Sequence, residues 1–116
     1  MPEQDLFTIL EAARWAPSAF NLQPWRFLYA FRGDVNWERS IRLLIPFNQE
    51  WAAGASVVLF ILSDSMTEAK GGSDQVSHSH SFDAGAAWAC LALQASMMGY
   101  QAHGMTGVNF DRARSA

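Results

Sequence analysis

The sequence predicts one domain, or part of a larger one, in which helices and strands are mixed. Apolar residues recur at helical spacing near both ends of the chain. Between them lie two apolar runs of strand length, Trp25–Phe31 and Ser56–Leu62, rich in aromatic and β-branched residues. The chain has 116 residues, 50% of them hydrophobic, which matches one ordinary domain and argues against intrinsic disorder.

Charge and cysteine content exclude several classes of protein. Eight Lys and Arg residues face 11 Asp and Glu residues, so the net charge is −3, and no basic field is available for nucleic acid or anionic lipid. The single Cys90 excludes an internal disulfide. No signal peptide is apparent, and the apolar runs are too short to span a bilayer. We therefore expect a soluble, cytoplasmic protein without nucleic-acid or membrane partners.

The N-terminal quarter predicts a helix, a stiff loop and a strand. Asp5–Trp15 carries an apolar face at helical spacing, formed by Leu6, Ile9, Leu10 and Ala13. Asp5 is the expected N-cap, and Pro17 ends the helix because it disfavours α geometry in the residue before it. Pro17–Pro24 is bracketed by prolines and rich in polar side chains, which is typical of a stiff loop. Trp25–Phe31 follows as a strand.

The middle of the chain predicts two short helical segments, a buried strand and a surface excursion. Val35–Leu44 fits a partly polar helix that Pro46 interrupts, and Asn48–Ala53 fits one further helical turn. Ser56–Leu62 is apolar throughout, which is typical of a strand buried on both faces. Ser63–Ser79 has few large apolar groups, so we expect a mobile surface segment.

Ser81–Met98 carries the strongest helical pattern in the chain. Ser81 is the expected cap, Asp83 suits the positive end of the helix, and Gly99 suits a left-handed residue after it. The helix is apolar nearly all round, with a stripe of small residues formed by Gly85, Ala89, Ala92 and Ser96. Such a helix is either the core helix of a monomer or, the interpretation we favour, a central helix that also contacts a second subunit.

The remaining segment predicts a short strand over Tyr100–Met105 and a new helix that begins near Asn109 or Asp111.

Side chains alone do not predict a catalytic or metal site. His78 and His80 lie two residues apart in a Ser-rich loop, but zinc requires three or four convergent ligands. Cys90 lies within an apolar helix, where a thiol is normally inert. Neither a nucleophile elbow nor a glycine-rich phosphate loop is present. If the protein is an enzyme, a cofactor should carry the reaction.

One stretch, Ala13–Phe27 (ARWAPSAFNLQPWRF), strongly resembles the nitroreductase family of flavin enzymes. In that family a helix ends in Ala-Pro-Ser, and Asn-x-Gln-Pro-Trp then runs into a strand. Asn48–Trp51, Asp83–Gly85 and Gly104–Gly107 resemble later segments of the family, in the same order. The resemblance extends from about Leu6 to Arg114.

The resemblance implies an α+β fold with a mostly antiparallel sheet flanked by helices, in an intertwined homodimer that holds two FMN molecules at the subunit interface. Pro17, Ser18, Asn21 and Gln23 would bind the flavin and its ribityl chain. The backbone N–H groups of Thr106-Gly107 would point at flavin N5 and O4, and the missing Cβ of the glycine would let the backbone approach the ring. Hydride would pass from NADH or NADPH through the flavin, which carries the chemistry, to a nitroaromatic, quinone or similar small aromatic acceptor.

The sequence departs from the family pattern at both ends. Family members begin with an Arg- and Ser-rich segment and continue well beyond the position of Arg114 with a further strand and an extension. We therefore expect residues 1–116 to be one nitroreductase-like domain that is shortened at both ends. The alternative is a truncated, non-catalytic dimeric remnant with weak or no flavin binding.

Overall fold

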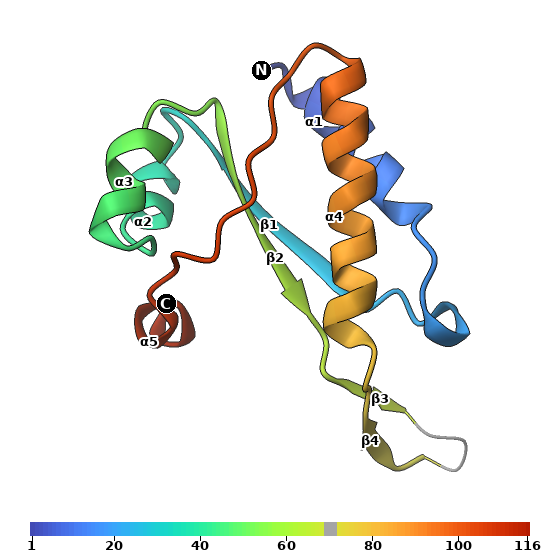
Figure 1. The fold of residues 1–116 in the computed structure, drawn as a ribbon. Helices are drawn as coiled ribbons and strands as arrows, with labels where there is room; N and C mark the ends of the chain where they lie inside the picture. The colour runs from blue at the N-terminus through green and yellow to red at the C-terminus, as the bar shows by residue number, and fades with distance from the viewer. Residues whose placement is uncertain (69–71) are drawn as a thin grey trace. The chain divides into compact units, whose positions relative to one another are not determined.

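The computed structural model describes residues 1–68 and 72–116, and the chain divides into two compact units (Figure 1). Unit 1 comprises Met1–Phe27 and Ile61–His103, and unit 2 comprises Leu28–Phe60 and Gly104–Ala116. Each unit is thus built from two stretches of chain that are distant in sequence. Part of the predicted surface segment, residues 69–71, lies outside the described residues.

Unit 1 is built on a pair of packed helices. Helix α1 (Glu3–Arg14) lies against α4 (His80–Met97), as Figure 1 shows. The buried residues of α1 are Leu6, Ile9 and Ala13, and the buried apolar residues of α4 are Ala84, Ala87, Leu91 and Ala95. Both sets recur at helical spacing, so burial of one apolar face on each helix drives the pairing. Three of the four residues from α4 are alanines, whose small side chains let the helices approach closely.

The C-terminal end of α4 agrees with the sequence-based prediction. Gly99 has a φ of +84°, and its N–H donates to the carbonyl of Ser96 at 3.0 Å. The N–H of Tyr100 donates to the carbonyl of Ala95 at 2.9 Å. These two bonds form a Schellman motif, which requires a left-handed residue at the position that glycine occupies.

Both predicted N-caps are wrong. Helix α1 begins at Glu3, and the carboxylate of Asp5 accepts a hydrogen bond from the Tyr100 hydroxyl at 2.5 Å. Helix α4 begins one residue earlier than predicted, with Ser79 at the N-cap position. The Asp5 carboxylate raises the pKa of Tyr100, because a hydrogen bond to a carboxylate favours the protonated phenol. In α1 the contact of Asp5 with the distant Tyr100 replaces the predicted cap.

Two small sheets are present. Strands β1 (Trp25–Phe31) and β2 (Val57–Ser63) form a two-stranded sheet, and β3 (Met66–Glu68) and β4 (Asp74–Val76) form another. In the second pair, Met66 lies opposite Val76 in antiparallel register, so the predicted surface segment Ser63–Ser79 contains two paired strands. In β2 only Val58 is buried, which differs from the predicted burial on both faces.

The ends of the first sheet show that it is antiparallel. The N–H of Asp64 donates to the carbonyl of Pro24 at 2.8 Å, and the N–H of Arg32 donates to that of Ser56 at 2.9 Å. The start of β1 therefore pairs with the end of β2, and the end of β1 pairs with the start of β2. The bounds of β1 match the predicted strand.

Unit 2 contains three short helices, α2 (Trp37–Ile41), α3 (Pro46–Ala52) and α5 (Phe110–Ser115). Its buried core consists of Ala30, Trp37, Ile41, Leu44, Ala52 and Val58. Pro46 is the first residue of α3, a position where the missing N–H costs nothing. The predicted α5 is confirmed: the Asn109 side chain caps it by accepting a hydrogen bond from the N–H of Arg112 at 3.0 Å.

Two predictions for unit 2 and its neighbouring chain segment need correction. The first helix is shorter than the predicted Val35–Leu44. The predicted strand Tyr100–Met105 is irregular, and an isolated bridge between Leu44 and Val108 stands beyond its end instead. The apolar content of this segment therefore reflects packing, since Met105 and Val108 contact the core of unit 2.

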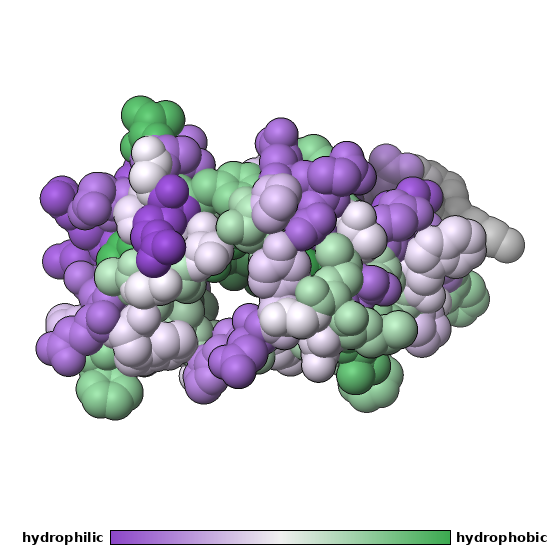
Figure 2. All heavy atoms as spheres, turned by 90° about the horizontal axis from the view of Figure 1, so that it is seen from above, coloured by the Kyte–Doolittle hydropathy of each residue, from purple (hydrophilic) through white to green (hydrophobic). Residues whose placement is uncertain are grey.

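Many hydrophobic side chains are exposed, and Figure 2 shows hydrophobic residues, in green, between hydrophilic ones on the face that it draws. On α4 the exposed set is Phe82, Leu93 and Met97. This helix was predicted to be apolar nearly all round, and in the structure one of its apolar faces is buried while another is exposed. No helix in the described ranges is long and apolar enough to cross a membrane.

Candidate functional site

The polar loop Pro17–Pro24 has an unusual backbone conformation. Ala19–Asn21 forms one turn of 3₁₀-helix, and three residues have left-handed φ angles: Phe20 at 51°, Asn21 at 54° and Gln23 at 50°. None of the three is a glycine, so each costs about 1–2 kcal/mol relative to an ordinary backbone conformation. Strain of this kind persists only where surrounding contacts hold it, and it often accompanies a functional site.

Hydrogen bonds within the loop supply part of that support. The Ser18 hydroxyl oxygen accepts a bond from the backbone N–H of Gln23 at 3.0 Å. The Gln23 side-chain amide donates to the Asn21 side-chain oxygen at 3.3 Å. Ser18, Asn21 and Gln23, the three polar loop residues predicted to bind flavin, are therefore linked to one another. Their side chains help to hold the conformation of the loop.

A buried carboxylate from α4 ties the loop to the helix pair. Oδ2 of Asp83 accepts a bond from the backbone N–H of Ala19 at 3.1 Å and another from the Ser79 hydroxyl at 3.0 Å. Asp83 is only 5% exposed and stands in the first turn of α4, where the helix dipole favours negative charge. Sequence reasoning assigned Asp83 to the start of the helix only. No local pattern indicates its second partner, which lies 64 residues away.

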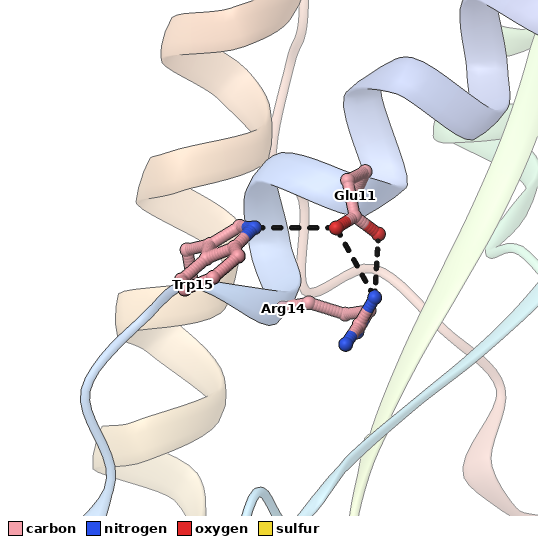
Figure 3. A network of polar contacts seen from close by, with 3 residues as sticks. All are labelled: Glu11, Arg14 and Trp15. Atoms are coloured by element: carbon pink, nitrogen blue, oxygen red, sulfur yellow. Dashed lines mark hydrogen bonds and ion pairs between the residues drawn. The ribbon is translucent and has the colours of Figure 1, made fainter.

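The arginines beside the loop have partners of their own. Nη1 of Arg26 donates to the carbonyls of Gln23 at 3.0 Å and Trp25 at 2.8 Å, which closes the end of the loop. Nη1 of Arg14 lies 2.9 Å from the Glu11 carboxylate, to which the Trp15 indole N–H also donates at 3.2 Å (Figure 3). The Arg14 pair is largely exposed, so it contributes little to stability.

The free hydrogen-bonding capacity of the loop suits an uncharged polar ligand. Asn21 is exposed, and its amide nitrogen donates to none of the described residues. Ser18 is half-buried and uses its oxygen as an acceptor, which leaves the hydroxyl proton for a ligand. Neutral amides and hydroxyls match the carbonyl, N–H and hydroxyl groups of a flavin and its ribityl chain. The loop therefore fits the uncharged part of FMN.

Thr106 and Gly107 belong to unit 2 and are held by backbone contacts. The Gly107 carbonyl accepts bonds from the N–H of Ile45 at 2.9 Å and from the Asn48 side-chain amide at 3.4 Å. A Cβ at position 107 would collide with Nδ2 of Asn48 and come within 2.9 Å of Cγ1 of Ile45. Packing inside unit 2 thus requires a glycine, a reason that differs from the predicted approach to a flavin ring.

The structure brings Pro17, Ser18, Asn21 and Gln23 together in one loop of unit 1 and holds Thr106 and Gly107 in unit 2. The N–H groups of Thr106 and Gly107 donate to no residue in the described ranges, so both stay available to a ligand. Sequence reasoning also missed the role of Asn48, which is 8% exposed and supports Gly107. Its place in the family-like segment Asn48–Trp51 was the available signal.

Comparison with known proteins agrees with the resemblance seen in the sequence. The family model described as "Nitroreductase family" matches residues 1–116. A solved structure described as an oxidoreductase containing FMN is 51% identical, with a TM-score of 0.95, and the match covers 99% of this chain and 58% of that one. An FMN-dependent nitroreductase from Clostridium difficile is 25% identical, with a TM-score of 0.60, over 85% of this chain and 48% of that one.

A curated protein of Thermus thermophilus named NADH dehydrogenase is 41% identical over 78 residues, which are 67% of this chain and 36% of that protein. The chain therefore spans about half of the length of the solved relatives and about a third of the curated one. Since the family model matches from the first residue to the last, and the fold is α+β with small antiparallel sheets, the chain belongs to the nitroreductase family.

Proposed function

We propose that the protein is an FMN-dependent oxidoreductase that passes hydride from NADH or NADPH, through the flavin, to a small aromatic acceptor such as a nitroaromatic or a quinone. The observation that carries this proposal is the loop Pro17–Pro24. Three left-handed residues, held by the Ser18, Gln23 and Asp83 contacts, present neutral polar groups. The FMN of two similar solved proteins supports the choice of cofactor.

In this proposal the side chains of the chain bind and orient the cofactor. Asn21 offers an amide to the flavin, and Ser18 offers its hydroxyl proton. Gln23 keeps Asn21 in place through the hydrogen bond between their side chains, and Pro17 stiffens the entry to the loop. Bound FMN supplies the hydride chemistry. Because these residues lie in a preformed loop, binding costs less conformational entropy than ordering a flexible one.

Thr106 and Gly107 are proposed to serve the reactive part of the flavin. Ile45 and Asn48 hold the Gly107 carbonyl, and the backbone N–H groups of Thr106 and Gly107 donate to none of the described residues. Donors that are fixed in advance stabilise negative charge without reorganisation, which is what a reduced flavin requires.

The choice of electron donor and acceptor rests on similarity and chemistry. The name of the Thermus thermophilus relative, NADH dehydrogenase, favours NADH. Nicotinamide and acceptor would stack in turn on the same flavin face. We expect broad acceptor use, because stacking on a ring selects for planar aromatic shape and not for one substituent.

We also propose that two copies form a cytoplasmic homodimer. The exposed face of α4 carries Phe82 at 82%, Leu93 at 67% and Met97 at 83% exposure. Gly85, Ala89 and Ser96 lie among them and are exposed too. Large and small residues that alternate on one helix face let a second helix approach closely. Sedimentation should show a dimer at micromolar concentration, and Leu93→Glu should yield monomer, since burial of an unpaired carboxylate is costly. A folded monomer for the unchanged protein would contradict this proposal.

The absorption spectrum of the freshly purified protein tests the cofactor proposal directly. Flavin bands at about 370 and 450 nm should be present, and NADH should bleach the band at the longer wavelength under anaerobic conditions. Addition of a quinone should restore it. A protein that shows neither band and takes up no added FMN would instead be the non-catalytic alternative.

Asn21→Ala tests the residue assignment. We expect FMN binding to weaken by about 1–3 kcal/mol, the usual cost of an unpaired buried polar group, with thermal stability of the flavin-free protein nearly unchanged. Asn36→Ala is the matched control, because Asn36 is an exposed asparagine of unit 2 whose side chain does not cap its helix. Equal losses of stability with and without flavin would make Asn21 a residue that only structures the loop.

A further inference from the structure

Asp83 is the one buried carboxylate in the described part of the chain. It is distant in sequence from all the residues that were predicted to bind flavin. We propose that Asp83 is a positioning residue that holds the loop Pro17–Pro24 in the conformation that binds FMN. This inference rests on the proposed flavin function and deepens it. In this inference the positions of Ser18, Asn21 and Gln23 depend on Asp83, whose carboxylate binds the backbone of the loop.

The hydrogen bonds of Asp83 reach the point where the loop changes direction. Ala19 has an N–H that donates to Oδ2 of Asp83 at 3.1 Å, and Ala19 is the first residue of the 3₁₀ turn. The next two residues, Phe20 and Asn21, have φ angles of 51° and 54°. The carboxylate therefore fixes the residue from which the chain enters left-handed geometry, immediately before the amide offered to the flavin.

The loop has little else to hold that point. The Phe20 side chain is 97% exposed and provides no packing. The other hydrogen bonds of residues 18–23 join loop residues to one another, as Ser18 with Gln23 and Gln23 with Asn21, or join Gln23 to the neighbouring Arg26. Within residues 1–68 and 72–116, the Asp83 bond is the only hydrogen bond that connects residues 18–21 to α4. Loss of this bond should let the left-handed residues relax, since each is strained by itself.

The surroundings of Asp83 explain why a carboxylate serves here. It lies in the first turn of α4, is 5% exposed, and uses the same oxygen for both Ala19 and the Ser79 hydroxyl. The Ser79 bond restrains the Asp83 side chain, so the oxygen that accepts from Ala19 is held in place. What the loop needs is an acceptor atom at this point, which an amide oxygen can also supply.

The test compares three substitutions in the intact protein by fluorescence titration with FMN. Asp83→Ala removes the acceptor and should raise the dissociation constant by about tenfold or more, as for a buried N–H left without a partner. Asp83→Asn keeps an acceptor oxygen and should restore binding to within a few-fold of the unchanged protein. Leu91→Ala removes a buried side chain of the same helix, 5% exposed, about two turns beyond Asp83. It should lower the melting temperature yet leave FMN affinity unchanged.

Hydrogen exchange in the flavin-free protein provides the second readout. Asp83→Ala should speed exchange of the amides of residues 19–23, whereas Leu91→Ala should not do so selectively. FMN affinity in Asp83→Ala equal to that of the unchanged protein, or unchanged exchange in the loop, would overturn the inference. If the unchanged protein binds no FMN, the proposed function fails, and the exchange measurement still decides whether Asp83 positions the loop.

Discussion

The contacts inside unit 1 differ in kind from the contacts inside unit 2. In unit 1, side chains tie the polar loop and the chain after α4 to the helices: the Asp83 carboxylate accepts from the N–H of Ala19, and the Tyr100 hydroxyl donates to Asp5. In unit 2 the shortest links at the proposed site join backbone atoms, from Ile45 to Gly107 and from Asn109 to Leu43, and the Asn48 side chain adds a longer bond to the Gly107 carbonyl. Both units hold residues proposed to bind the flavin, so the protein uses two ways of fixing a ligand-binding segment.

The difference predicts how each unit responds to change. A segment held by side chains is sensitive to the loss of one polar group and to pH, but it tolerates added volume where space is open. A segment held by backbone bonds keeps its contacts when a side chain is changed, but it is sensitive to anything that pushes the backbones apart. The stability of unit 1 should therefore respond most to the loss of polar groups, and the stability of unit 2 to added side-chain volume.

Gly107→Ala should give the largest effect, because it adds volume where unit 2 has none. The new Cβ would collide with the side-chain nitrogen of Asn48 and press against Ile45. We expect a loss of about 1–3 kcal/mol in the free energy of unfolding, the usual cost of overpacking, measured by urea denaturation. An unchanged midpoint would show that Asn48 moves aside freely and that shape does not limit this segment.

Gly85→Ala is the matched change in unit 1 and should act in the opposite direction. Gly85 lies within α4 and is exposed, and, apart from the adjoining backbone of the helix, no described atom lies within 4 Å of the position that a Cβ would take. Alanine should stabilise the helix by about 0.5–1 kcal/mol in a dissociated protein. A loss of stability under those conditions would mean that space, and not side-chain chemistry, also limits unit 1.

The half-buried pair of Tyr100 and Asp5 should give the smallest effect, visible only at high pH. The hydrogen bond raises the pKa of Tyr100 above its ordinary value of 10.0, so the folded protein holds the phenol proton more tightly than the unfolded chain. The stabilisation is complete below that ordinary value and is lost as pH rises through the raised pKa. In Tyr100→Phe, denaturation measured across this range should show a weaker alkaline loss.

The second tyrosine, Tyr29, is present in both proteins, so the difference between them reports on Tyr100 alone. Identical slopes of stability against pH would show that the bond to Asp5 makes no net contribution in solution.

Elements that depend on local pattern could be predicted from the sequence. The bounds of β1 match the prediction, α4 begins and ends one residue before it, and Gly99 closes that helix as expected. A strand formed by a continuous apolar run, or a helix end closed by a glycine, depends on residues that are adjacent in the sequence. The hairpin of β3 and β4 escaped because its strands are three residues long and mostly polar, which leaves no detectable alternation.

The candidate site could be predicted only in part, for a related reason. The motif from Pro17 to Gln23 identifies a loop with the right chemistry, because its residues are adjacent in sequence. The contribution of Asp83 depends on a hydrogen bond across 64 residues, and the requirement for Gly107 depends on the side chain of Asn48. Such pairs follow from the fold, and a single sequence carries no local trace of them.

The packing of α1 on α4 also bears on the order in which the protein is made. The two helices of unit 1 come from its first and second stretches of chain, Met1–Phe27 and Ile61–His103. At about 5–20 residues per second of synthesis, α1 leaves the ribosome several seconds before α4 is complete. A lone helix of 12 residues is marginal in water, so α1 waits unfolded, its apolar face uncovered. Helix α1 is thus synthesised well before α4, the helix that covers its apolar face.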